Sequence, residues 1–153
     1  MGRPATRVRR FGAHAILVEV SGSDEALDLA AWVRRRDLDV ADVVPAATTV
    51  LLDGVAEVDR VVAELEHWRP GAGPPRGDVV ELPVRYDGPD LGFVAEHWGL
   101  DLQQAVRRHA AGEYVVAFCG FAPGFAYLTG LAEEHAVPRL EQPRTRVAPG
   151  AVG

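Results

Sequence analysis

The chain has 153 residues, 48% of them hydrophobic, which is enough to bury a core in one domain or in two small ones. Its formal net charge of −6 argues against nucleic acid and against an anionic membrane surface as partners. It has no apolar run of the roughly 18 residues that a membrane-spanning helix needs, and its single cysteine, Cys119, cannot form an internal disulfide, which fits a cytoplasmic protein.

The amino-terminal half predicts two strands, a helix, two more strands and a second helix. These elements are expected at residues 6–10, 13–20, 23–37, 40–44, 49–52 and 55–68. Apolar and β-branched runs closed by turn residues indicate the strands, and Ser23 is a candidate N-cap for the first helix. Side chains at helical spacing are expected to face the sheet: Leu27, Ala30, Ala31 and Arg34, with Trp32 and Val33, in the first helix, and Val58, Val61, Val62 and Leu65 in the second. Two helices over one face of a small antiparallel sheet predict a ferredoxin-like α+β domain.

A segment rich in proline and glycine follows the second predicted helix. It covers residues 71–77, where neither a helix nor the interior of a sheet is favoured. We therefore predict a linker there, between a domain of residues 1–70 and a domain of residues 78–153.

The second predicted domain opens with a strand, continues with two helices and returns to a buried strand. These elements are expected at residues 78–86, 89–98, 101–111 and 113–119. Asp101 is a candidate N-cap for the second of these helices. From Gly120 onward, repeated glycine and proline predict a loop without regular structure.

The loop that follows the strand at 113–119 combines glycine, proline and aromatic residues. Its candidate ligand-binding residues are Gly120, Phe121, Pro123, Gly124 and Tyr127. Glycines in such a place let backbone N–H groups approach an anionic ligand closely. The alternative is that the glycines serve tight turns and that the aromatic side chains pack in a core.

Three arginines, Arg139, Arg144 and Arg146, lie close together in a segment stiffened by proline. Guanidinium groups held in this way can bind a carboxylate or a phosphate with little loss of entropy. The alternative is a solvated basic strip that contributes little.

Two histidines near the ends of predicted helices, His97 and His109, are candidates for proton transfer with Glu96 or Glu113. The alternative is that each histidine is structural or simply exposed. Cys119 is interpreted as a small buried hydrophobic residue rather than a nucleophile. No spacing of histidine and cysteine predicts a metal site.

All 16 basic residues are arginine, and the serines are limited to Ser21 and Ser23. A Walker A phosphate loop and a Schiff-base enzyme need a lysine, and a Ser and Lys amidase needs both residue types. If the protein takes part in amide chemistry, other residues or another subunit must supply these groups.

The segment EYVVAFCGFAPGFAYLTGL, followed by VPRLEQPRTRV, resembles the signature of the KipI and allophanate hydrolase subunit 1 family, whose members are also known as the B subunit of 5-oxoprolinase. The pattern G-F-x-P-G-F-x-Y-L-x-G-L, with P-R and P-R-T-R-V at the family's spacing, is specific. Upstream, LPVRYDGPDLGFVAEHWGLDLQQAVRRHAAGEY is similar to the strand and helices that precede the signature. The resemblance spans almost the whole chain.

The resemblance implies a small α+β domain followed by a cyclophilin-like β-barrel domain. Family members continue through a Q-T-G and an S-P-G-G-W motif into further barrel strands, whereas this sequence stops at Gly153. We therefore expect a barrel that is truncated at its carboxy-terminal side. The serine of the family's V-P-A-G-S is replaced by Ala151, so any role of that serine is lost.

The activity implied by the resemblance is that of an ATP-dependent 5-oxoprolinase, which opens 5-oxo-L-proline to L-glutamate. This chain would act only as one component of the enzyme and would share ATP with a larger cyclophilin-like partner. That partner would be of the type found as the C subunit of 5-oxoprolinase or as allophanate hydrolase subunit 2. The substrate would be a small anionic amide, bound by the loop and the arginines, with His97 or Glu113 in proton transfer.

Two further functions remain open from the family's names. One is allophanate hydrolase subunit 1 in the breakdown of urea-derived amides, and the other is a non-catalytic KipI-like inhibitor of a sensor histidine kinase. An unclosed barrel also leaves room for a homo-oligomer, because its edge strand would have unpaired backbone groups.

Overall fold

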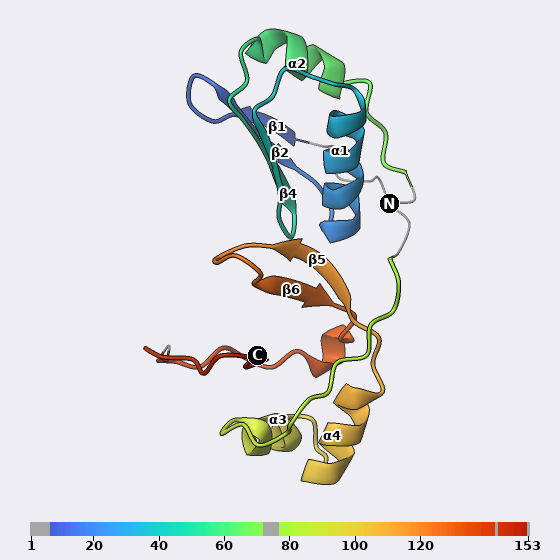
Figure 1. Ribbon diagram of the computed structural model, residues 1–153, viewed down its shortest axis with the longest axis vertical. Coiled ribbons are helices and arrows are strands. Elements are labelled where there is room, and N and C mark those ends of the chain that lie inside the picture. The colour runs from blue at the N-terminus through green and yellow to red at the C-terminus, as the bar shows by residue number, and fades with distance from the viewer. Residues whose placement is uncertain (1–6, 72–76, 143, 153) are drawn as a thin grey trace. The chain divides into compact units, whose positions relative to one another are not determined.

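A computed structural model describes residues 7–71, 77–142 and 144–152 (Figure 1). The chain divides into two compact units, one formed by residues up to Asp78 with Val116–Thr129, the other by Val79–Val115 with residues from Gly130 on. The predicted domains of residues 1–70 and 78–153 stay a prediction, and most of the predicted linker, at 72–76, lies outside the described residues.

The first unit contains a four-stranded antiparallel sheet in the order β1-β2-β4-β3. Its strands are β1 (Arg7–Arg10), β2 (Ala15–Glu19), β3 (Asp42–Pro45) and β4 (Thr49–Asp53). The central strands β2 and β4 pair in a register that places Ile16 opposite Leu52 and Val18 opposite Val50. These four side chains point to one face of the sheet and are fully buried there.

Two helices cover that face, α1 (Ser23–Arg35) and α2 (Val58–Leu65). Their buried residues join the four central strand residues in one hydrophobic core, and Trp68 is the last residue along the chain that belongs to it. Figure 1 shows α1 alongside the sheet. The element order ββαββα and the apolar face predicted for the second helix are confirmed.

The first helix differs from its prediction in two respects. It is preceded by Gly22 as N-cap, without a side-chain cap, and Ser23 is already helical. Its buried stripe, Ala26, Leu29, Ala30 and Val33, is displaced by one residue from the predicted stripe. The observed stripe is apolar throughout, whereas the predicted one included Arg34, which stays exposed and donates to the Val43 carbonyl. The large Trp32 lies at the rim, stacked under Arg36.

The second unit contains α3 (Leu91–His97) and α4 (Leu102–Ala110), which pack against each other. The predicted N-cap of α4 is confirmed. The Asp101 side chain accepts from the Gln104 N–H at 2.7 Å, and the Gln104 side chain accepts from the Asp101 N–H at 3.0 Å. This reciprocal capping box begins the helix at Leu102.

The prediction of a strand at residues 78–86 was wrong, because no regular strand forms there in the structure. The segment exposes its apolar side chains, with Val79 86% and Leu82 74% exposed. Backbone N–H and C=O groups form a strand only when another strand accepts and donates their hydrogen bonds. In the described part of the chain, this segment pairs with none.

The loop predicted after Gly120 contains a strand instead. β6 (Ala126–Thr129) pairs with β5 (Val115–Cys119) in a two-stranded sheet, and a short 3₁₀ turn, η1, follows at Glu133–His135. The intervening glycines and proline close a turn rather than ending regular structure. The predicted α+β class is confirmed, with four α-helices and two small sheets in the described residues.

Candidate functional site

The turn between β5 and β6 carries the loop residues predicted to bind a ligand. The Gly120 N–H donates to the Phe125 carbonyl at 3.0 Å, which brings the two ends of the turn together. Within the turn, Phe121 has a φ of 63° and Gly124 a φ of 76°. The left-handed region is ordinary for glycine and costly for phenylalanine, so Phe121 is held there by the tight closure of the turn.

Four aromatic rings form a row along this hairpin. The Phe118 ring stacks on Tyr127 with centroids 4.5 Å apart, Tyr127 meets Phe125 edge to face at 5.3 Å, and Phe125 meets Phe121 at 5.4 Å. Phe121, at the end of the row, is 91% exposed. Of the two alternatives for these residues, a filled aromatic core does not apply, because the row stands open to solvent.

The three predicted anion-binding arginines lie in the second unit and are not equivalent. Arg144 Nη2 donates to Asp90 Oδ1, at the residue that precedes α3. Arg139 and Arg146 are exposed and have no acidic partner among the described residues. An anion could therefore bind Arg139 or Arg146 directly, whereas Arg144 first has to leave Asp90.

The two residues predicted for proton transfer, His97 and Glu113, are both exposed. His97 ends α3 and stacks its ring on Phe93 at 6.2 Å, one turn earlier in the helix. In the described part of the chain, no hydrogen bond joins His97 to Glu113. The role of His97 and Glu113 in proton transfer stays a prediction.

A cluster around His109 was missed as a unit in the sequence. The Tyr86 hydroxyl and His109 Nδ1 share a hydrogen bond of 2.7 Å, and the Tyr114 hydroxyl donates to the His109 carbonyl at 3.0 Å. The Tyr114 ring also stacks on the imidazole at 5.0 Å. Burial, and then the negative charge that Tyr86 can acquire, raise the pKa of Tyr114 above its ordinary value of 10.0.

A second cluster surrounds His135. Arg108 Nη1 lies 2.6 Å from His135 Nε2, and since a guanidinium can only donate, Nε2 is the acceptor. Trp98 Nε1 donates to the His135 carbonyl at 2.8 Å, and the two rings meet edge to face. Trp98, just after α3, and Arg108, in α4, thus both contact His135 in η1, and this histidine has a structural role.

The described residues contain no group of three or more histidine, cysteine, aspartate or glutamate side chains that could hold a metal ion. In the same residues, no helix combines the length and the apolar character that a bilayer crossing needs. Cys119 ends β5 and is exposed, which contradicts its interpretation as a buried residue. It lies at the open edge of the turn rather than in a core.

Comparison with known protein families shows which family the chain belongs to. The family model described as carboxyltransferase domain, subdomain C and D, matches residues 6–153. The chain belongs to this family. The membership confirms the resemblance to the KipI and allophanate hydrolase subunit 1 family seen in the hairpin and arginine motifs.

Curated relatives of this carboxyltransferase C and D chain include two that are named as the B subunit of 5-oxoprolinase. The protein of Escherichia coli O157:H7 is 42% identical over 108 residues, which are 69% of this chain and 47% of that protein. The protein of Bacillus subtilis (strain 168) is 44% identical over 78 residues, 49% of this chain and 32% of that protein. The chain thus spans about half the length of the Escherichia coli protein and about a third of the Bacillus subtilis protein.

A solved structure shares the fold of this family member. The crystal structure of TTHA0988 matches it with a TM-score of 0.69 at 32% identity, over 92% of this chain and 29% of that one. Most of that longer chain therefore has no counterpart in the present sequence.

Proposed function

We propose that this chain is a subunit of an ATP-dependent 5-oxoprolinase, which converts 5-oxo-L-proline, ATP and water to L-glutamate, ADP and phosphate. The observation that carries the proposal is the 42% identity over 108 residues to the B subunit of 5-oxoprolinase from Escherichia coli O157:H7. The name of that relative, as one subunit, supports action with partners. We assign the partner role to a larger cyclophilin-like protein, of the type found as the C subunit of 5-oxoprolinase or as allophanate hydrolase subunit 2.

The chain's own chemistry suits a shared active site. It has no lysine and only two serines, so it lacks the residues of a Walker A loop or a Ser and Lys amidase. In the described residues, the N–H groups of Phe121 and Gly124 make no hydrogen bond within the protein. Such N–H groups, like the exposed Arg139 and Arg146, fit an anionic carboxylate or phosphate. ATP, shared with the partner, would supply the phosphoryl group that activates the lactam.

The remaining roles follow the sequence predictions. Gly120, Pro123 and Tyr127 would shape the substrate pocket together with the aromatic row, and His97 or Glu113 would move a proton. The exposure of these residues supports a site that is completed by another polypeptide. The small anionic amide would then be enclosed only in the complex.

Reconstitution tests the proposal. The purified chain alone should show no 5-oxoproline-dependent ATP hydrolysis, and addition of the partner subunits from the same genome should give glutamate in step with ADP. Rapid turnover by the isolated chain would contradict the shared site. No glutamate with all partners present would contradict the proposed activity.

Arginine variants in the reconstituted enzyme test the anion-binding role. Arg146→Lys should raise KM for 5-oxoproline or ATP about tenfold, because lysine keeps the charge and loses the bidentate fork. Arg85→Lys is a matched control, since Arg85 is exposed and outside the loop and arginine motifs. Equal kinetics for both variants would remove Arg146 from the site.

The finer fold assignment belongs to the same proposal. In a ferredoxin-like sheet the strand order is 4-1-3-2, and the order β1-β2-β4-β3 corresponds to it if the last strand of that fold were moved to the start of the chain. This supports a ferredoxin-like domain at 1–70. A linker at 71–77 and the first part of a cyclophilin-like barrel at 78–153 stay part of the proposal, on the resemblance alone.

A second function is favoured by one observation, the exposed aromatic row that ends at Phe121. Exposed apolar surface of this kind is typical of protein docking. A KipI-like inhibitor would bind a sensor histidine kinase through it. Phe121→Ser should then abolish inhibition of autophosphorylation by the chain, and full inhibition by that variant would exclude this route.

A further inference from the structure

The two edges of the four-stranded sheet differ in how their backbone groups are used. At the β3 edge, the Val43 N–H donates to the Asp42 carboxylate at 2.8 Å and the Val43 carbonyl accepts from Arg34 Nη2 at 2.9 Å. The next outward position is Pro45, which has no N–H. This edge is poorly suited to another strand, since its outward N–H groups are satisfied or missing.

The β1 edge has the opposite character. The Phe11 N–H donates to the Ala15 carbonyl at 2.8 Å, so by the alternation of an antiparallel ladder Arg9 and Arg7 also bond inward, to β2. The N–H and C=O groups of Val8 and Arg10 therefore point out of the sheet. In the described part of the chain, nothing bonds to them.

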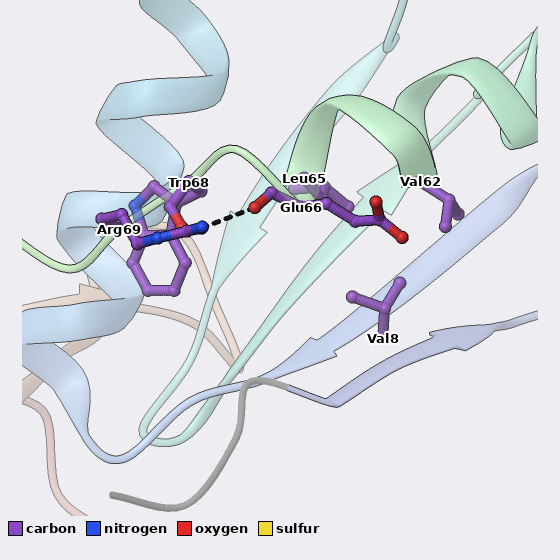
Figure 2. A pocket seen from close by; sticks show the side chains of 6 residues that line it. All are labelled: Val8, Val62, Leu65, Glu66, Trp68 and Arg69. Atoms are coloured by element: carbon purple, nitrogen blue, oxygen red, sulfur yellow. Dashed lines mark hydrogen bonds between the residues drawn. The ribbon is translucent and has the colours of Figure 1, made fainter.

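A groove of about 360 Å³ opens beside this edge on the helix face (Figure 2). Its apolar wall consists of Val8, Val62, Leu65 and Trp68, and its rim carries Glu66 and Arg69. Trp68 is fixed because its Nε1 donates to Asp28 Oδ2 at 3.3 Å, and Arg69 is turned back onto the Glu66 and Trp68 carbonyls. We call this groove the socket; its floor is apolar, its rim is polar, and it lies next to open backbone groups.

The opposite face of the same edge is basic. Val8 packs against the core on the helix face, so its neighbours Arg7 and Arg9 project from the other face of the sheet. Arg9 is only partly neutralised by Glu19, at 3.2 Å on the exposed surface. An added strand would therefore meet the socket, with its apolar floor, on one face and two guanidinium groups on the other.

We propose that the β1 edge binds an extended segment of another protein by strand addition, and that this segment has the pattern acidic–apolar–acidic. A residue paired directly with Val8 would exchange both hydrogen bonds with it and share its face, so its side chain would enter the socket. The residues before and after it lie on the other face, beside Arg7 and Arg9. This docking site is independent of the proposed enzyme function.

A labelled peptide tests the proposal with the full chain unchanged. The probe is fluorescein-Ser-Thr-Glu-Leu-Glu-Thr-Ser, and we expect saturable fluorescence anisotropy. N-methylation of the leucine nitrogen removes the hydrogen bond to the Val8 carbonyl and should weaken binding about tenfold. N-methylation of the following glutamate is the matched control, because that nitrogen points away from β1, and should leave affinity within about twofold. Replacing both glutamates by lysine should weaken binding about fivefold.

Protein variants locate the site. Val62→Glu places a charge in the socket and should abolish binding, whereas Val44→Glu, on the blocked β3 edge, should not change it. No anisotropy change up to about 1 mM peptide, or equal weakening by both N-methylated peptides, would overturn the proposal. A homodimer in sedimentation that Val62→Glu dissociates would also overturn it, because the occupant would then be a second copy.

Discussion

Residues 7–71 and residues 77–152 differ in how much of their apolar sequence is buried in a core. Up to Trp68 the described residues bury thirteen hydrophobic side chains, including Ile16, Leu29 and Leu52, whereas beyond it they bury three, all alanines. The second region does not lack apolar residues, since Val79, Leu82 and Phe121 are strongly exposed. Apolar content therefore does not make a core until a second layer covers each apolar face.

The largest effect on stability is expected when a large apolar side chain is shortened in the first region, compared with the same change in the second region. Leu52→Ala should lower the free energy of unfolding by about 2–5 kcal/mol, because Leu52 is fully buried opposite Ile16. Leu82→Ala, the matched control, should change it by less than about 0.5 kcal/mol. Urea unfolding followed by far-UV circular dichroism gives both values. Comparable losses would show that residues 79–84 are packed in solution.

Two glycines with similar backbone angles sharpen the comparison. Gly54 has φ +64°, and an added Cβ would lie 2.4 Å from the Ala41 Cβ, whereas Gly124 has φ +76° and open space around it. Gly54→Ala should cost about 3 kcal/mol, from left-handed strain and overpacking together, and Gly124→Ala about 1 kcal/mol, from strain alone. Urea midpoints measure the difference. A larger loss for Gly124→Ala would mean that the hairpin turn is as tightly packed as the core.

Loss of the capping box of α4, in the second region, should lower stability by a smaller amount. Asp101→Ala should lower the free energy of unfolding by about 1 kcal/mol, because it leaves the Gln104 N–H without its acceptor. Gln103→Ala is the control, since Gln103 is exposed and outside the box. Hydrogen exchange should quicken in the first turn of α4 for Asp101→Ala only. Unchanged exchange there would show that packing on α3, rather than the cap, begins the helix.

Local signals predicted the fold best where they were complete within a short window. The order ββαββα, the face of α2 and the Asp101 cap could all be inferred from spacing and residue type. The face of α1 was predicted one residue away from the observed one, because the predicted stripe included Arg34, whose charged group stays at the surface. The strand at 78–86 failed for another reason, since a strand also needs a neighbour, which no local pattern reveals.

The sequence proposed the residues of the candidate site but not the contacts that they make. The hairpin places Gly120 beside Tyr127 and joins Tyr127 to Phe121 through Phe125, while their role in ligand binding stays a prediction. The attachment of Arg144 to Asp90 joins positions 54 residues apart, beyond the reach of any spacing argument. The same holds for Tyr86 and His109, 23 residues apart, although a tyrosine just after a helix that ends in histidine could have drawn attention to Tyr114.

The smallest predicted effect concerns Tyr114, whose pKa lies above 10.0 in the folded protein because its hydroxyl is partly buried and because Tyr86 can carry a negative charge nearby. The protonated form is thus favoured by folding, so its contribution to stability is fully present below pH 10.0 and is lost as pH rises through the higher folded pKa. Absorbance titration at alkaline pH should show a late ionisation step from Tyr114, and Tyr114→Phe should remove that step. Tyr86→Phe should move the step toward lower pH, because it removes the neighbouring negative charge, whereas Tyr127→Phe, in the hairpin, should leave it in place. A late step that survives in Tyr114→Phe would show that another tyrosine is the shielded one. The side chains around His109 would then not be packed together, and this part of the second region would behave like an unfolded chain.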